Sequence, residues 1–186
     1  MSTDTRQSLL DKAAFMLRSK GYAAFSYGDL EKAVGIRKAS IHHYFPKKED
    51  LGLEIVSSYI KQTATNFENI EHDFPSAFGR LCAFASLFRV ARQEDMLPLC
   101  GALAAEMAAL PDTMQKLTKQ YFNIQLDWLE KTIKMGIVNG ELSTTCSPRQ
   151  KAFQVLSFLE GSSFICWAIK DEVDFESYLL KDILGI

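Results

Sequence analysis

The stretch from Ser26 to Leu51, SYGDLEKAVGIRKASIHHYFPKKEDL, constrains the fold more than any other part of the chain. It holds two short helical patterns separated by Gly35, and a Phe-Pro step ends the second one. Glycine supplies the positive φ of a sharp turn, and proline disfavours helical geometry in the residue before it. Two short helices joined by such a turn are typical of a helix-turn-helix, whose second helix enters the DNA major groove.

The second short helix, expected over residues 37–44, has two different faces. Ile36, Ile41 and Phe45 can point inward. The remaining polar residues then lie outside: Arg37, Lys38, Ser40, His42 and His43. Such residues donate hydrogen bonds to base edges and phosphates, and Arg suits guanine best because its fork matches two acceptors. Arg37 and Lys38 could also simply solvate a surface helix, but the neighbouring turn favours DNA contact.

Residues on both sides of this helix extend the expected DNA surface. Ser26 can cap the preceding helix, with Asp29 three residues later in a capping box, and its backbone can also meet a phosphate. Lys47 and Lys48 open the next helix, where cations are disfavoured by the helix dipole. A phosphate at this helix end would make both lysines favourable.

Three aromatic or imidazole side chains in this segment leave alternatives open. His42 and His43 are adjacent, so they face different directions and do not form a same-face pair of metal ligands. We expect them to donate hydrogen bonds to the DNA backbone or bases. Tyr44 either packs under the helix or reaches a phosphate.

Composition and charge limit the class of protein. Hydrophobic residues make up 47% of the 186, and charged residues 24%, which is typical of a globular chain. The net charge is −2, but residues 1–50 hold nine Lys/Arg against six Asp/Glu, whereas residues 51–186 hold twelve against seventeen. A basic head on an acidic body fits local phosphate contact. The longest charge-free run, Met96 to Ala105, is too short to span a bilayer.

No motif for catalysis, metal or cofactor binding is recognisable. The four cysteines, Cys82, Cys100, Cys146 and Cys166, form no CxxC spacing. With no signal peptide, we expect free thiols, a cytoplasmic protein, no metal and no cofactor. Gly-rich phosphate loops, H-E-x-x-H and G-x-S-x-G are all absent, so we predict no catalytic residues and no enzyme.

Helical periodicity continues to the C-terminus. We expect an all-α fold, in which residues 1–50 form a three-helix DNA-binding head and residues 51–186 a helical bundle. The expected helices cover residues 5–20, a short second helix after Ser26 with Leu30, Ala33 and Val34 buried, then 37–44, 47–71, 75–92, 97–109, 112–137, 148–169 and a last one from Phe175.

Aromatic and sulfur-containing side chains of the body could line a ligand pocket. The set is Phe84, Phe88, Cys100, Met107, Tyr121, Phe122, Trp128, Phe158 and Trp167. Such residues at helical spacing also form ordinary core. Cys100 is either a small buried hydrophobe or a reactive sensor thiol.

The segment Phe153 to Ile169 is apolar nearly all round, so other elements must cover it on all sides. Its small residues would let another helix approach closely, and with the last helix it suggests a four-helix dimer interface. The predicted interface residues are Phe153, Leu156, Gly161, Phe164, Tyr178 and Ile183. An ordinary buried helix within one protomer is the alternative.

The segment GIRKASIHHYFPKKEDL, from Gly35 to Leu51, resembles the signature of the tetracycline-repressor (TetR) family. That signature is a turn, a Lys-Gly/Ala-Ser/Thr-aliphatic step, an aromatic cluster ending in Phe, then Lys and Leu. The resemblance spans Leu9 to about Leu53. Where many members have Tyr, this chain has His42.

The resemblance implies a homodimeric repressor that binds a palindromic double-stranded DNA operator and is released by a largely apolar small-molecule inducer. Carried over, the family's DNA contacts fall on Ser26, Tyr27, Arg37, Lys38, Ser40, His42, His43, Tyr44 and Lys48. Two other functions remain open from the sequence: an all-helical protein-interaction module, and an enzyme with a scattered active site in the body.

Overall fold

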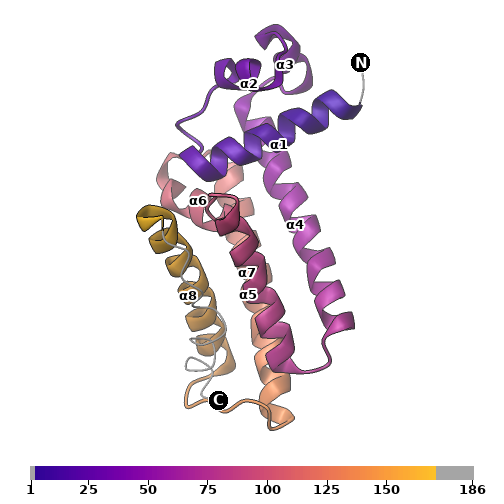
Figure 1. Cartoon of the computed structure of the whole chain (residues 1–186), viewed down its shortest axis with the longest axis vertical. Coiled ribbons are helices and arrows are strands. Elements are labelled where there is room, and N and C mark those ends of the chain that lie inside the picture. The colour runs from indigo at the N-terminus through magenta and orange to yellow at the C-terminus, as the bar shows by residue number, and fades with distance from the viewer. Residues whose placement is uncertain (1–2, 171–186) are drawn as a thin grey trace. The chain divides into compact units, whose positions relative to one another are not determined.

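The computed structural model describes residues 3–170, and all regular structure in that range is helical, which confirms the predicted all-α class. Figure 1 shows the elements in chain order: α1 (Thr3–Lys20), α2 (Tyr27–Val34), α3 (Lys38–Tyr44), α4 (Lys48–Asp73), α5 (Ala77–Gln93), α6 (Leu99–Ala105), the short 3-10 helix η1 (Met107–Ala109), α7 (Asp112–Val138) and α8 (Pro148–Ile169).

The chain folds as two compact units. The first, here called the head unit, consists of residues 1–61 together with 99–121. The second, the body unit, consists, among the described residues, of 62–98 and 122–170. Packing therefore groups α6, η1 and the start of α7 with the three N-terminal helices. The expected functional boundary near residue 50 stays a prediction.

The first helix of the head follows its sequence pattern closely. Its apolar stripe is buried: Leu9, Leu10, Ala13, Ala14, Met16 and Leu17. α1 ends at Gly21, where φ is +94° and the backbone N–H donates to the Leu17 carbonyl at 2.9 Å. A glycine in this left-handed conformation is the usual stop of a helix, because it carries no Cβ. Within the head unit α1 packs against both α2 and α6.

The helix-turn-helix also forms as expected. Ser26 caps α2: its hydroxyl accepts from the Asp29 N–H at 3.4 Å and its own N–H donates to the Asp29 carboxylate at 2.8 Å. Gly35 ends α2 with φ +76°, and its N–H donates to the Glu31 carbonyl at 2.9 Å. The capping box and the turn predicted from the sequence are both confirmed.

Three details differ from the sequence-based expectation. Ala33 is exposed, because only Tyr27 and Leu30 of α2 are buried. The helix expected over residues 97–109 is two elements, since the backbone at Glu106 (φ −111°, ψ 17°) leaves helical geometry between α6 and η1. The helix expected from Phe175 lies outside the described residues.

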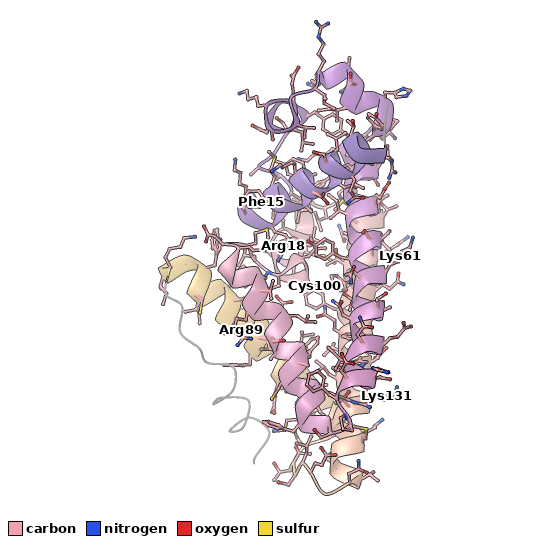
Figure 2. All side chains as sticks on the ribbon, turned by 45° about the vertical axis from the view of Figure 1, so that its right-hand side comes forward. Phe15, Arg18, Lys61, Arg89, Cys100 and Lys131 are labelled. Atoms are coloured by element: carbon pink, nitrogen blue, oxygen red, sulfur yellow. The ribbon has the colours of Figure 1, made fainter. Side chains whose placement is uncertain are left out.

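The body unit is built around one apolar cluster. α5 and α8 pack against each other (Figure 1), and the end of α4 and most of α7 contribute to the same cluster. Its aromatic members are in ring contact: Phe67 stacks on Trp128 at 4.4 Å, and Phe84 lies 5.4 Å from Phe88 and 5.6 Å from Trp128. Figure 2 shows Lys131 of α7, whose ammonium donates to the Glu71 carboxylate of α4 at 3.0 Å.

α8 spans Pro148–Ile169, the bounds expected from the sequence. Ser147 and Gln150 form a capping box, and Pro148 takes the first helical position. Among the described residues α8 is the one helix long and apolar enough to cross a membrane, although a core helix of a soluble protein passes the same test. The longest charge-free run of the sequence does not fall in α8, because Glu160 interrupts the apolar residues of this helix.

Candidate nucleic-acid interface

The outer face of α3 carries exposed cationic and imidazole side chains. Arg37, Lys38, His42 and His43 are exposed, and Ser40 is half-buried. Ile41 (0% exposed) fixes the opposite face in the head core, and Phe45 (2%) follows the helix end. Neither Arg37 nor Lys38 forms an ion pair within the described part of the chain. This face therefore offers charged donors that the head itself does not use.

The start of α3 is held by α2 rather than by its own cap. Arg37 occupies the N-cap position but makes no side-chain cap bond. Instead, the Glu31 carboxylate of α2 accepts from the Lys38 backbone N–H at 3.2 Å. One side chain thus satisfies a free donor of α3 and fixes the angle of the turn, while the Arg37 and Lys38 side chains remain exposed.

The two lysines at the start of α4 have different environments. Lys47 is exposed, and its backbone N–H donates to the Asp50 carboxylate at 2.9 Å. The Lys48 ammonium instead donates to the carbonyls of Tyr22 and Phe25 and lies 4.6 and 4.3 Å from the centres of their rings. Both rings are buried and meet edge to face.

Lys48 therefore joins the loop between α1 and α2 to the start of α4. Burial lowers the pKa of the Lys48 ammonium, and the nearby carboxylates of Glu106 and Asp29 partly oppose that shift. Two of the three ammonium donors are thus used within the head, so we propose a structural role for Lys48, and its expected phosphate contact stays a prediction. Lys47 keeps an exposed ammonium at the same helix end.

Two further expected contacts also use their donors inside the head. Tyr27 is 6% exposed, and its hydroxyl donates to the Phe45 carbonyl at 2.8 Å. The Ser26 hydroxyl and N–H both donate to Asp29, at 2.7 and 2.8 Å. A phosphate oxygen accepts hydrogen bonds, and neither side chain has a donor left for it. We therefore propose structural roles for both side chains, a core tyrosine and a helix cap, and their expected DNA contacts stay predictions.

The histidines and Tyr44 lie along the rest of α3. The His42 ring contacts the Tyr27 ring edge to face at 4.8 Å, and its Nδ1 lies 3.2 Å from the Pro46 carbonyl, so the second ring nitrogen is left for a ligand. His43 contacts Tyr44 at 5.8 Å between ring centres. Tyr44 is half-buried, which keeps both of its alternatives open. Groups of His, Cys, Asp and Glu that could hold a metal are absent from the described residues.

One contact at the base of the head has no signal in the sequence. The Glu106 carboxylate, between α6 and η1, accepts from the Ala23 N–H at 2.9 Å. A Cβ built on Gly21 would lie 2.2 Å from the same carboxylate. The partners are 83 residues apart in the chain. Gly21 is therefore required twice, for its positive φ and for the approach of Glu106.

The expected ligand-binding residues do not form one group. Phe84, Phe88 and Trp128 lie in the apolar cluster of the body unit, and Phe122 and Phe158 pack against that cluster. The remaining four lie elsewhere: Cys100, Met107 and Tyr121 in the head unit, and Trp167 under the Lys170 ammonium of the body unit, 5.0 Å from the ring centre. Cys100, labelled in Figure 2, is 2% exposed, as a small buried hydrophobe would be.

The expected dimer residues also divide. Phe153 is 63% exposed, and Gly161 and Phe164 are half-buried. A Cβ on Gly161 would meet nothing within 4 Å. Leu156 is 4% exposed and belongs to the apolar cluster, so it is a core residue of the body unit, and its expected place at a dimer interface stays a prediction. Tyr178 and Ile183 lie outside the described residues.

Two features of the body unit were missed by sequence reasoning. A shallow surface hollow on α7 is lined by Asp127, Glu130, Lys131 and Lys134, whose charges are paired with one another or with Glu71 and Arg149. The other is Glu160 of α8, whose two carboxylate oxygens are buried without a hydrogen-bond partner. The sequence does carry a signal for Glu160: it is a charged residue inside an apolar segment. Helical periodicity puts it next to the residues of α8 that are buried.

Comparison with known proteins agrees with the geometry of the head. The family model described as "Bacterial regulatory proteins, tetR family" matches residues 9–55. The chain is 31% identical over 154 residues to the transcriptional regulator AcuR of Cereibacter sphaeroides, an alignment that covers 76% of this chain and 67% of that protein. It is 32% identical over 73 residues to the regulator EthR of Mycolicibacterium smegmatis, but there it spans only 34% of the relative.

A solved structure extends the likeness to nearly the whole chain. A TetR-family transcriptional regulator from Agrobacterium tumefaciens is 27% identical, with a TM-score of 0.86 over 98% of this chain and 94% of that one. The family model covers the helix-turn-helix, and AcuR and this structure cover the helices that follow. The chain belongs to the tetR family of bacterial regulatory proteins, and its N-terminal helix-turn-helix is the family's DNA-binding element.

Proposed function

We propose that this regulator is a homodimeric repressor that binds a pseudo-palindromic operator and is released by a small molecule held in its body. The observation that carries the DNA-binding part is the outer face of α3. There Arg37 and Lys38 are exposed and make no ion pair within the described residues, while Ile41 anchors the helix from behind. The family consists of transcription regulators, which are generally not enzymes.

The proposed DNA contacts are narrower than those expected from the sequence. They comprise Arg37, Lys38, Ser40, His42 and His43 on α3, with Tyr44 kept as an open position, and Lys47 in place of Lys48. Ser26, Tyr27 and Lys48 instead hold the helices that present these residues. Two such heads, one duplex turn (~34–36 Å) apart, would read a two-fold symmetric site in the cytoplasm.

An operator selected from random duplexes tests this proposal. Gel shifts with the purified full chain should show a preference for the selected duplex over a scrambled one, and affinity should fall steeply with salt because bound cations displace counterions. Arg37→Ala with Lys38→Ala should weaken binding by at least about 100-fold, the loss of roughly 1–3 kcal/mol for each base or phosphate contact in each protomer.

The matched control is Lys116→Ala with Lys119→Ala, which changes the charge equally on exposed positions of α7. It should leave operator affinity within about twofold. Equal binding of selected and scrambled duplexes at physiological salt would refute the proposal. Unchanged operator affinity in the variant with Arg37→Ala and Lys38→Ala would mean that another surface binds the DNA.

A further inference from the structure

Among the described residues, the Glu160 carboxyl and the Thr132 hydroxyl are the buried side-chain groups that lack a hydrogen-bond partner, and of the two only the carboxyl is ionisable. Glu160 as a whole is half-buried, yet both carboxylate oxygens are buried and lack a hydrogen-bond partner. The stem of the side chain therefore lies near the surface of α8, and the carboxyl group points into the protein. Burying a carboxyl without a partner is costly, so stability alone would favour an apolar residue here.

The helix itself does not satisfy Glu160. The hydroxyls of Ser162 and Ser163 both donate to the Leu159 carbonyl, at 3.1 and 2.7 Å, so their protons are already used. Leu156 and Leu159, one turn and one residue earlier, belong to the apolar cluster of the body unit. Burial alone raises the pKa of the Glu160 carboxyl to about 8.

Charged groups on α5, α7 and α8 have other partners or are exposed. On α5, Arg80 donates to the carbonyls of Phe74 and Glu71, and Arg89 is exposed. On α8, Lys170 pairs with Asp95 and Arg149 with Asp127. The charged residues of α7 in the surface hollow pair with one another or with these partners.

The chemistry around Glu160 selects a cation. The cluster that contains Leu156 and Leu159 also contains the rings of Phe84, Phe88 and Trp128. An anionic ligand would meet the acidic side chain of Glu160 rather than a counter-charge. An ammonium group supplies both the donor hydrogens that two unpartnered oxygens lack and a charge that aromatic faces accept.

We propose that Glu160 anchors an organic cation, a primary or secondary ammonium carried on an apolar body, as the effector of this regulator. This rests on the proposed function, in which the body unit binds the releasing molecule. When the cation binds, the carboxyl O–H proton leaves to solvent and the ammonium takes its place as donor. Binding of such a ligand therefore strengthens as pH rises, whereas a carbonyl ligand held by the neutral acid would bind more tightly at low pH.

Matched pairs of probes test the charge requirement. Benzylamine, phenethylamine and hexylamine are each compared with the alcohol of the same shape, by calorimetry and thermal shift on the full chain at millimolar ligand. The variants are Glu160→Gln, which keeps the shape of the side chain, and Glu68→Gln, the same change at an exposed position of α4. The best amine should bind wild type and Glu68→Gln alike.

In Glu160→Gln the affinity for that amine should fall roughly 10- to 100-fold, the equivalent of one charge-assisted hydrogen bond, while the alcohol should bind both proteins equally. Calorimetry in buffers of different ionisation enthalpy should show proton release on binding near neutral pH.

The proposal is overturned when no amine binds better than its alcohol, or when Glu160→Gln binds the amine as wild type does. Uptake of a proton on binding would also overturn it. Operator binding by the same protein samples is measured in parallel. If the amine binds no better than the alcohol while operator binding is intact, this inference alone is refuted. If specific operator binding is absent, the proposed function is refuted.

Discussion

Adjacent residues Lys47 and Lys48 differ in role because of what each ammonium meets. The Lys48 ammonium is shared between two carbonyls and two rings of the α1–α2 loop, whereas the Lys47 side chain is exposed. Hydrogen bonds from a charged donor contribute more than neutral ones, and leaving their buried acceptors unpaired adds a further cost. Lys48 therefore supports the DNA-binding surface, and we propose that its neighbour Lys47 belongs to that surface.

The pair makes a direct prediction. Lys48→Met should lower the free energy of unfolding by about 1–3 kcal/mol, measured by denaturant melts, because two carbonyls lose a charged donor. Lys47→Ala should change stability by less than about 0.5 kcal/mol but reduce the salt dependence of operator binding, by about 0.9 in log–log slope for each protomer. Equal stability of the two variants would contradict the role given to Lys48.

Glu160 predicts an unusual dependence of stability on pH. Its folded-state pKa, about 8, lies above the unfolded value of roughly 4.3, so the folded protein holds the proton that the unfolded chain releases. The stability that this proton provides is complete below about pH 4 and is lost as pH rises through about 8.

Compared with wild type, Glu160→Gln should therefore become progressively more stable as pH rises across this window. By pH 8 the difference should be at least about 1.4 kcal/mol larger than at pH 5, the equivalent of one pKa unit. Thermal melts of both proteins over this range measure it, with Glu68→Gln as the exposed control. A difference that does not change with pH would show that the Glu160 carboxyl is already ionised or paired.

At the scale of elements, Gly21 and Gly35 end two helices in the same left-handed conformation but have different surroundings. A Cβ on Gly21 would meet the Glu106 carboxylate, whereas a Cβ on Gly35 would meet nothing within 4 Å. Both substitutions impose backbone strain of roughly 1–2 kcal/mol, because a side chain disfavours positive φ. Only the first also displaces Glu106 from the Ala23 N–H.

Gly21→Ala should therefore destabilise the protein by about 1 kcal/mol more than Gly35→Ala, in chemical denaturation. In a Glu106→Ala background the two glycine variants should cost the same, because the contact is already gone. An excess for Gly21→Ala that persists in this background would mean that Glu106 is not its cause.

The elements were predictable from the sequence to the extent that they are local. The stop at Gly21, the cap at Ser26, the turn at Gly35 and the start at Pro148 each depend on residues within four positions of one another. Periodicity likewise identified the buried stripe of α1. These signals need no knowledge of what packs where, which is why they also revealed the helix-turn-helix.

The roles of single side chains were less predictable, because they depend on partners distant in sequence. Tyr27 bonds a residue 18 positions away, Lys48 bonds residues 23 and 26 positions away, and Glu106 bonds one 83 positions away. A tyrosine or lysine near a DNA-binding helix has the same local signature whether it faces DNA or the core. The exposed face of α3 was identified because its neighbours Ile41 and Phe45 reveal the inner side.

At the scale of the whole molecule, α8 carries apolar side chains that are exposed among the described residues. Phe153, Ile165 and Ile169 are 63, 59 and 59% exposed. Phe164 stands on the same helix face as Phe153, about three turns further along, and Gly161 lies beside that face about two turns along. Apolar faces of this kind mark association sites, and we propose that a second copy covers this one.

Phe153→Glu with Ile165→Glu should shift the full chain from dimer to monomer in light scattering, because buried carboxylates without partners oppose association. The control is Val138→Glu at the end of α7, a position that is 85% exposed and outside the proposed interface. It should leave the mass unchanged. A dimer that persists in the α8 variant would place the interface elsewhere.

The composition of the head unit sets a rule for building hybrid regulators. If only residues 1–50 were exchanged for the DNA-binding end of another regulator, Lys48 and its partners would be exchanged together. Gly21 and Ala23, however, would be separated from Glu106. Residues 99–121 pack in the same unit as residues 1–61. A chimera that transplants both segments keeps these contacts together, and its junctions then fall within α4, at the start of α6 and within α7.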